Sequence, residues 1–381
     1  MRKKIYPVIL VIFISFLLLL TAAGCRNIQA PAATATAVPA SSEAPAEPTL
    51  APTPLPVVDV TLTAEGKVVD PYRIYTSDSC AQDILSLGQT YSDIVSVESI
   101  GQSTAGKEMY ILKVGKGPVK VLITAATHAR ENITTNYVMR QAEELAAAYI
   151  NNQTYESYDI VQLLNNFTLY ISPMNNPDGV DICNGYADPV GFTNVTDWTK
   201  TVWKANGRGV DLNRNFPFEW DTMKENDTEN TAPSRMNYPG DSSASEQETQ
   251  NLMRLVQNHD FQFCLNFHTK GKILYWHDPV NGDIPGDSKL VNIIHDCLGF
   301  TVAGTTQNVR NYGGGFENWF RSVTNKPGIC IEMTAGGDGD VPYNHPQRAE
   351  LCDQVYDIYS KQVLDWDRSK ALFPYILENY F

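Results

Sequence analysis

The chain has 381 residues, of which 43% are hydrophobic and 10% aromatic, which is enough for a sizeable core in one large or two ordinary domains. Its formal net charge at pH 7 is -14, and an acidic surface of this kind argues against nucleic acid as a partner. The composition therefore predicts a globular protein that binds something other than nucleic acid.

Residues 1–24 have the composition of a signal peptide. A basic start precedes the apolar run Val8–Leu20, which is too short for a comfortable membrane span, and small residues lead up to Cys25. This ending resembles the bacterial lipobox and predicts a lipidated Cys25 at the outer face of the cell membrane; because Ala22 stands where leucine is preferred, ordinary secretion remains the alternative. Removal of residues 1–24 takes away three basic residues and no acid, so the net charge goes from -14 to -17.

Residues 25–58 are rich in Pro, Ala, Thr and Ser and cannot bury enough apolar surface to fold. We interpret them as a tether that leads to a folded domain at residues 59–381. The six cysteines beyond Cys25 are widely spaced and include no C-x-x-C pair, so we expect buried thiols rather than a disulfide framework.

From residue 59 onward, helical and strand patterns alternate along the chain. The predicted strands are Val95–Gly101, Glu108–Gly115, Val119–Ala126, Phe167–Met174, Phe261–Thr269 and Gly328–Thr334. The predicted helices are Ala81–Ile94, Asn132–Ile150, Ser245–His259, Ser288–Leu298, Gly314–Ser322 and Pro346–Trp366, and a loop-rich stretch covers Asn175–Ser243. This alternation predicts a single α/β domain with a mixed, mostly parallel twisted sheet that helices cover on both faces.

Three predicted strands end in residues that can bind metal or move protons. "THARE" contains His128 and Glu131, "NFHT" contains His268, and "IEMT" contains Glu332. The loops beyond the carboxyl ends of such strands form the active-site crevice. Catalytic zinc takes three protein ligands and leaves a fourth position open, so the first three residues predict a zinc site, although each histidine alone could be a hydrogen-bonded structural residue.

Seven short motifs follow one another along the chain: "THARE" (Thr127–Glu131), "NNPDGV" (Asn175–Val180), "GVDLNRNF" (Gly209–Phe216), "YPG" with "SEQET" (Tyr238–Thr249), "NFH" (Asn266–His268), "GGGFENW" (Gly313–Trp319) and "IEMT" (Ile331–Thr334). In number and order they resemble the zinc carboxypeptidases similar to carboxypeptidase A, also called funnelins. The resemblance covers about Tyr75–Trp366. Within the family, "WKANGRGVDLNRNFP" and "FHTKGKILYW" are most similar to the bacterial γ-D-glutamyl-L-diamino-acid peptidases, which cut cell-wall peptides.

The resemblance implies a catalytic role for five residues. His128, Glu131 and His268 would bind one zinc ion, and Glu332 would be the general base that takes a proton from the attacking water and delivers it to the leaving amine. Asp211 would accept a hydrogen bond from the first histidine and fix its orientation. A buried ion pair is the alternative for Glu332, and a turn residue is the alternative for Asp211.

The resemblance also implies a substrate-binding set. Asn213 and Arg214 match the pair that holds the terminal carboxylate of the substrate, a task that suits a planar guanidinium. Arg130 matches a further substrate-facing arginine, although a solvated charge at a helix start is an alternative. Lys204 stands where many relatives have an arginine that stabilises the oxyanion, and it can supply the charge but not the fork.

Two positions follow from counting along the motif "NYGGGFENW". Tyr312 is the candidate for the mobile substrate-binding tyrosine of the family. Glu317 falls at the base of the pocket for the residue after the scissile bond, where a carboxylate favours a basic side chain; an exposed helix charge is the alternative.

These expectations together predict a zinc metallopeptidase that cuts a γ-D-glutamyl-diamino acid bond in peptidoglycan stem peptides. One alternative is a general metallocarboxypeptidase that removes basic C-terminal residues, and another is a catalytically inactive peptide-binding lipoprotein. The expected partners are a peptide and, through Cys25, a membrane, and the expected state is a monomer.

Overall fold

A computed structural model describes residues 55–335 and 363–381 of the chain. The predicted signal peptide, Cys25, the tether up to residue 54 and most of the predicted helix Pro346–Trp366 lie outside these residues. In the part of that helix that is described, residues 363 and 364 form a turn, Asp365 is the N-cap, and a new helix begins at Trp366.

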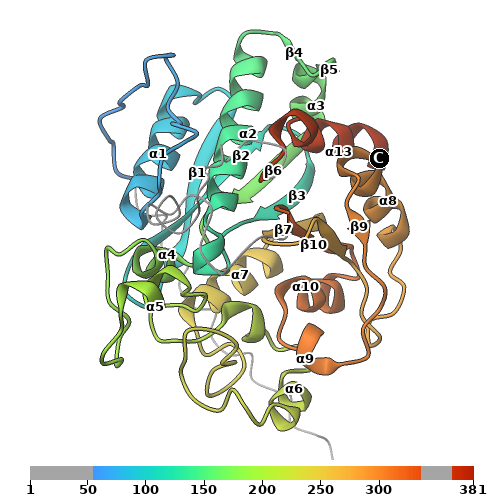
Figure 1. Ribbon diagram of the computed structural model, residues 1–381. Coiled ribbons are helices and arrows are strands. Elements are labelled where there is room, and N and C mark those ends of the chain that lie inside the picture. Colours follow the sequence, from blue (N-terminus) through green and yellow to red (C-terminus); the bar gives the residue numbers. More distant parts are fainter. Residues whose placement is uncertain (1–54, 336–362) are drawn as a thin grey trace, which may run out of the picture. The chain divides into compact units, whose positions relative to one another are not determined.

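An eight-stranded sheet forms the centre of the described domain (Figure 1). Its strand order is β1 (Val95–Gln102), β2 (Glu108–Gly115), β6 (Phe167–Ser172), β3 (Val119–Thr124), β7 (Phe261–His268), β10 (Gly328–Glu332), β8 (Ile273–Tyr275) and β9 (Thr301–Val302). The four central strands β6, β3, β7 and β10 are parallel to one another. The pairs β1–β2, β2–β6 and β10–β8 are antiparallel, and β9 pairs in parallel with β8. The predicted mixed, mostly parallel sheet is confirmed.

Both faces of the central strands are buried because successive side chains of a strand point to opposite sides. In β3, Val121 and Ile123 pack into one core cluster and Leu122 into a second. The first cluster includes residues of the helices α1, α2, α8 and α13, and the second includes residues of α7 and α10. Burying one such aliphatic side chain stabilises the fold by about 1.5–3 kcal/mol, so these two layers account for the near-continuous apolar runs of the strands.

The helices follow the strands in the expected alternation. Their bounds are α1 Ser77–Thr90, α2 Ile133–Ile150, α3 Ile160–Asn166, α4 Pro177–Cys183, α5 Asp197–Thr201, α6 Trp220–Asn226, α7 Gln247–Gln257, α8 Asp287–Leu298, α9 Val309–Tyr312, α10 Phe316–Thr324, α12 Trp366–Ser369 and α13 Leu372–Tyr380. Two 3-10 helices, η1 (Ala129–Glu131) and η2 (Leu212–Arg214), and a small hairpin of β4 (Thr154–Tyr155) and β5 (Tyr158–Asp159) complete the set. None of the described helices has the length and apolar character needed to cross a bilayer.

Cysteines contribute to the fold as packed thiols. Cys80, Cys183, Cys264 and Cys330 are buried, Cys297 is half-buried, and all five are free. The four buried cysteines agree with the expectation of buried thiols, Cys297 is only partly buried, and Cys352 lies outside the described residues.

Candidate metal centre and substrate cavity

The segment after β3 turns sharply before it reaches the first candidate ligand. Ala126 has a φ of +48°, in the left-handed region that costs a non-glycine residue about 1–2 kcal/mol. Its N–H donates to Thr134 Oγ1 at 2.9 Å, and the Ala129 N–H donates to the Lys204 carbonyl at 3.1 Å. These bonds hold the turn, and η1 then brings His128 and Glu131 to the same side.

The second histidine arrives on a different strand. His268 is the last residue of β7, and its Cα partner in the parallel ladder is Glu332, the last residue of β10. Because β3, β7 and β10 are parallel, their carboxyl ends meet at one edge of the sheet. The fold therefore brings together residues that are up to 204 positions apart in the sequence, from His128 to Glu332.

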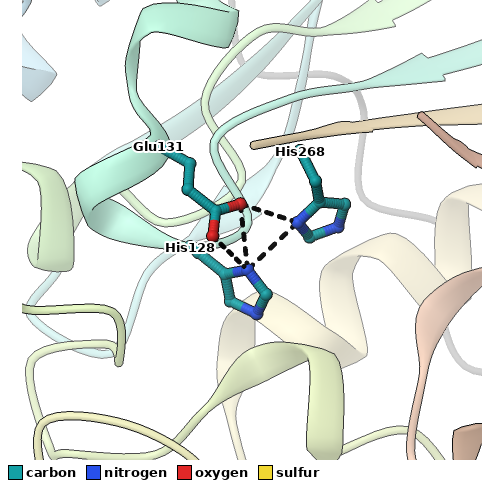
Figure 2. A group of neighbouring side chains, drawn as sticks. All are labelled: His128, Glu131 and His268. Carbon is teal, nitrogen blue, oxygen red and sulfur yellow. Dashed lines mark hydrogen bonds and ion pairs between the residues drawn. The ribbon is translucent and has the colours of Figure 1, made fainter. Parts of the chain in front are cut away.

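Figure 2 shows His128, Glu131 and His268 converging on one point. The two Nδ1 atoms of the histidines lie 3.0 Å apart, and His268 Nδ1 lies 2.9 Å from Glu131 Oε2. His128 Nδ1 lies 3.0 Å from Glu131 Oε1. All three residues are at least 95% buried. Two imidazole nitrogens and a carboxylate are one of the donor sets that hold catalytic zinc, so the chemistry of these residues fits that ion.

Asp211 fixes the tautomer of the first histidine. Its Oδ1 lies 3.1 Å from His128 Nε2, so the ring proton belongs on Nε2 and the lone pair of Nδ1 faces Glu131. Asp211 is fully buried, and its oxygens also accept from the backbone N–H groups of Asn213 and Asn237 at 3.1 Å. Burial alone would raise the pKa of Asp211, but the charges of His128 and Lys204 outweigh it and hold that pKa well below the usual range.

The pKa of Glu131 is set by the same opposing effects of burial and nearby positive charge. Burial would raise its pKa, yet the charge of His128 and the hydrogen bonds of both histidines lower it well below the usual value. Glu332 differs, because burial and the negative charge of Glu131 raise its pKa well above the usual value, while Lys204 acts against them. Glu332 Oε2 is buried and makes no hydrogen bond within residues 55–335 and 363–381.

A cavity of about 340 Å³ opens beside these groups. Its walls include eight residues that the sequence singled out: His128, Lys204, Asn213, Arg214, His268, Tyr312, Glu317 and Glu332. Arg130 lies in η1 and is not among the lining residues, so it is the one predicted substrate-binding residue that the structure does not bring to the cavity wall.

The carboxylate-binding candidates sit at the junction of η2 and α10. Asn213 Oδ1 accepts from the Phe316 N–H at 2.8 Å, at the first residue of α10, and Arg214 Nη1 donates to the Asn213 carbonyl at 2.8 Å. Gly314 has a φ of +68°, and a Cβ at this position would clash with the Arg214 carbonyl oxygen. The triple glycine of the motif therefore lets the chain pass close behind Arg214.

Tyr312 and Glu317 lie on either side of this glycine turn. The ring of Tyr312, at the end of α9, packs against Phe218 with centroids 6.4 Å apart. Glu317 is in the first turn of α10, is only 8% exposed, and its Oε2 accepts from Asn266 Nδ2 at 3.0 Å. Glu317 is therefore a wall residue of the cavity rather than an exposed helix charge.

Sequence reasoning missed part of the wall. Tyr275, Trp276 and His277, at and after the end of β8, also line the cavity. They lie in "FHTKGKILYW" or directly after it, but a three-residue strand gives too short a pattern to be recognised. Nothing in the sequence indicated the role of Asn266, which stands two residues before His268 and contacts Glu317 from behind the wall.

Comparisons with known proteins give one consistent result. The family model described as zinc carboxypeptidase matches residues 81–339. Gamma-D-glutamyl-L-diamino acid endopeptidase 1 of Lysinibacillus sphaericus is 28% identical over 277 residues, which are 71% of this chain and 68% of that protein. Carboxypeptidase B of Astacus astacus is 28% identical over 254 residues, which are 61% of this chain and 77% of that protein. The structure of carboxypeptidase A from Helicoverpa armigera shares the fold, with a TM-score of 0.53 at 19% identity and coverage of 72% and 69%.

Proposed function

The chain belongs to the zinc carboxypeptidase family and is a zinc-dependent peptidase, and from this premise we propose that it hydrolyses the γ-D-glutamyl-diamino acid bond of peptidoglycan stem peptides. The observation that carries the proposal is the buried carboxylate of Glu317 in the cavity wall, because a carboxylate there attracts a substrate side chain that ends in an amino group. The relative from Lysinibacillus sphaericus, whose name specifies a diamino acid, supports it.

His128, Glu131 and His268 would hold the zinc ion, with Asp211 keeping the His128 ring in place. A zinc ion bound there polarises a carbonyl group and lowers the pKa of water. Glu332 would accept the proton of the attacking water and return it to the leaving amine. Its raised pKa, caused first by burial and then by the charge of Glu131, brings it nearer the pH at which a base both takes and gives a proton.

The other cavity residues would orient the substrate. Arg214 and Asn213 would hold a substrate carboxylate, and the single positive charge of Lys204 would face the carbonyl oxygen as it becomes negative. Tyr312, on the opposite side of the glycine turn, would close over the bound side chain, and Arg130 would act on the substrate from η1.

Removal of basic C-terminal residues from ordinary peptides is the second candidate. It uses the same anchors, and the similarity to carboxypeptidase B of Astacus astacus supports it. We favour the γ-linked substrate because the relative named for that bond matches a larger share of this chain, 71% against 61%.

The test compares two peptides that share a C-terminal diamino acid and differ only in whether it follows a γ-D-glutamyl or an α-L-glutamyl residue. We expect faster hydrolysis of the γ-linked peptide by the zinc-loaded protein, and a reversed preference would favour the general carboxypeptidase. A Glu332→Gln variant should retain zinc in metal analysis and lose activity. Full activity in that variant would contradict the role of Glu332.

We further propose that the protein is a monomer attached to the outer face of a bacterial membrane through lipidated Cys25. The basic start, the short apolar run and the small residues before Cys25 support this placement. A Cys25→Ser variant should move from the membrane fraction to the soluble fraction of cells. If it stays with the membrane, the lipid anchor is wrong.

A further inference from the structure

Five side chains behind the cavity form a chain of hydrogen bonds that ends on Glu317. The Ser172 hydroxyl donates to Asn175 Oδ1 at 2.7 Å, and Asn175 Nδ2 donates to Thr127 Oγ1 at 3.0 Å. The Thr127 hydroxyl donates to Asn266 Oδ1 at 3.4 Å, and Asn266 Nδ2 donates to Glu317 Oε2 at 3.0 Å. Each residue in this chain therefore donates to the next one, and the last bond is donated to the Glu317 carboxylate.

The chain is buried throughout and crosses the carboxyl edge of the sheet. Asn175 and Asn266 are fully buried, and Ser172 and Thr127 are each 1% exposed. Buried networks whose members are all bonded hold one arrangement of their side chains, since each alternative leaves a polar atom without a partner. The network thereby joins the end of β6, the turn after β3, the end of β7 and the start of α10.

Asn266 has its orientation set by two hydroxyl groups. Its Oδ1 accepts from Thr124 Oγ1 at 2.8 Å as well as from Thr127 Oγ1 at 3.4 Å. Turning the amide over would place its NH₂ group against these hydroxyls and its oxygen against the Glu317 carboxylate. The two threonines therefore keep the NH₂ group facing Glu317.

This arrangement leaves one oxygen of Glu317 for a ligand. Oε2 is engaged by Asn266, whereas Oε1 makes no hydrogen bond in the described part of the chain. The side chain lines the cavity. A carboxylate held through one oxygen presents its other oxygen in a fixed direction. Its side chain therefore loses less conformational entropy when it binds a cation.

We propose that Asn266 is a positioning residue for substrate selection: by holding Oε2 of Glu317, it aims Oε1 at the amino group of the residue after the scissile bond. The inference rests on the proposed function, which gives Glu317 that amino group to bind. Asn266 itself is fully buried and is absent from the cavity wall, so it acts through Glu317 and not on the substrate.

A purely structural network would behave differently in one measurable respect. Weaker joining of the strand ends would lower the rate on all substrates alike, because the metal ligands follow the same strands. Loss of aim at Glu317 lowers the rate only for substrates that carry the amino group. The ratio of kcat/KM for a lysine substrate to kcat/KM for a norleucine substrate, both γ-D-glutamyl-linked, separates the two roles, since norleucine lacks only the amine.

The experiment uses the full-length zinc-loaded protein. We expect the wild type to prefer lysine, E317Q to remove that preference, and N266A to reduce the ratio about tenfold, the effect of losing one charge-assisted hydrogen bond. In a double-mutant cycle, N266A should change the ratio no further once Glu317 is replaced. T124V, which removes one hydroxyl from Asn266 with little change in shape, should lower the ratio in the same direction and decides the question if N266A does not fold.

The control is Asn136→Ala, which removes another fully buried asparagine, one that donates to the carbonyls of Pro71 and Arg73 at 3.0 and 2.7 Å. It should leave the ratio unchanged. A preference lost in E317Q but kept in both N266A and T124V would overturn the positioning role alone. A wild type that does not distinguish lysine from norleucine would contradict the proposed role of Glu317 itself.

Discussion

Two buried groups of ionisable side chains in this domain differ in how their charges are arranged. In the candidate metal centre, His128, Glu131 and His268 all bring electron pairs to one point. In the second group, the Arg321 guanidinium lies between two carboxylates, 2.6 Å from Asp278 Oδ2 and 2.6 Å from Asp287 Oδ2. The side chains of this second group are at most 1% exposed.

The difference distinguishes a charged group that stabilises the fold from one that can bind a metal ion. Arg321 supplies the cation that its neighbours need, and its Nη2 also donates to the Gly282 carbonyl at 2.8 Å, so it ties the loop from Asp278 to the start of α8 against α10. The histidine group has no arginine or lysine among its three side chains, and each of the three can offer an electron pair to a metal ion. A buried group that includes its own counter-charge can stabilise the fold. A buried group made only of metal-ligand atoms is suited to bind a cation from solution.

The largest expected effect comes from removing a donor at the metal centre. His268→Ala should lower zinc content and reduce kcat/KM on the order of a thousandfold or more, since a bound metal supplies several kcal/mol of transition-state stabilisation. Zinc added to metal-free protein should raise the Tm of the wild type but not of the variant. His295→Ala is the control, because His295 Nδ1 bonds to the Phe300 carbonyl at 2.7 Å and His295 is not among the residues that line the cavity. Equal zinc content in the wild type and in His268→Ala would contradict the prediction that His268 binds the metal.

Arg321 should show the reverse pattern. Arg321→Met leaves two buried carboxylates without their cation, and we expect the free energy of unfolding to fall by about 3–5 kcal/mol. Zinc affinity per folded molecule should stay near that of the wild type in a titration below the Tm. Lys370→Ala, which breaks the more exposed pair with Glu156 at 3.0 Å, should cost less than about 1 kcal/mol in the same urea denaturation.

A third buried group, Glu248 with Asp178, has no cation among the hydrogen-bond partners found in the described residues, and it predicts a pH effect. Glu248 accepts from the Thr104 N–H and hydroxyl at 3.1 and 2.8 Å, and Asp178 accepts from neighbours of Thr104 in the same turn. Burial, and then the charge of Asp178, raise the pKa of Glu248 from 4.5 to about 7.

Between these two pH values the folded protein keeps a proton that the unfolded chain has released, so the wild type loses stability as pH rises from about 4.5 to 7. Glu248→Gln cannot ionise and should gain on the order of 2–3 kcal/mol relative to the wild type between pH 4 and pH 7.5. Denaturation curves at these two pH values measure the difference. An identical pH dependence in both proteins would show that Glu248 is not the group responsible.

The smallest expected effect concerns the orientation of a ligand. Asp211→Asn weakens the grip on His128 Nε2 and should lower zinc affinity by about tenfold to hundredfold without removing a donor. Asp181→Asn is the matched control, since Asp181 is a buried aspartate that accepts from the Ser77 N–H at 2.7 Å, away from the metal centre. If both variants bind zinc equally well, Asp211 does not position His128.

Strong periodic patterns predicted the core of the fold, and three strand ends predicted where the candidate site lies. Strands β6 and β7 have every or nearly every residue buried, and β3 has its last four residues buried, which is why their apolar runs were recognisable. The stretch Asn175–Ser243 was expected to be loop-rich, and the sequence did not predict the short helices α4, α5 and α6 within it. Helices of five to seven residues span fewer than two turns and are too short to show a 3.6-residue period.

The polar supports of the site were harder to predict. Asn266 and Arg321 act through partners 51 and 34 to 43 residues away, and no local pattern joins residues at such separations. Arg321 does follow Glu317 by four residues on α10, a spacing that usually indicates a surface pair on a helix. Here both side chains face inward and each contacts a different segment, which only the tertiary structure determines.

The pairing of β10 with β7 makes the position of Glu332 sensitive to the length of β10. Glu332 and His268 are partners in that ladder, and the Met333 N–H donates to the His268 carbonyl at 2.8 Å just beyond it. Because the side chains of a strand alternate with a period of two, deletion of one residue within Gly328–Ile331 would turn the glutamate to the opposite face of the sheet. Substitutions in this strand can therefore be absorbed by packing, but a change of a single residue in its length would separate Glu332 from the candidate metal ligands.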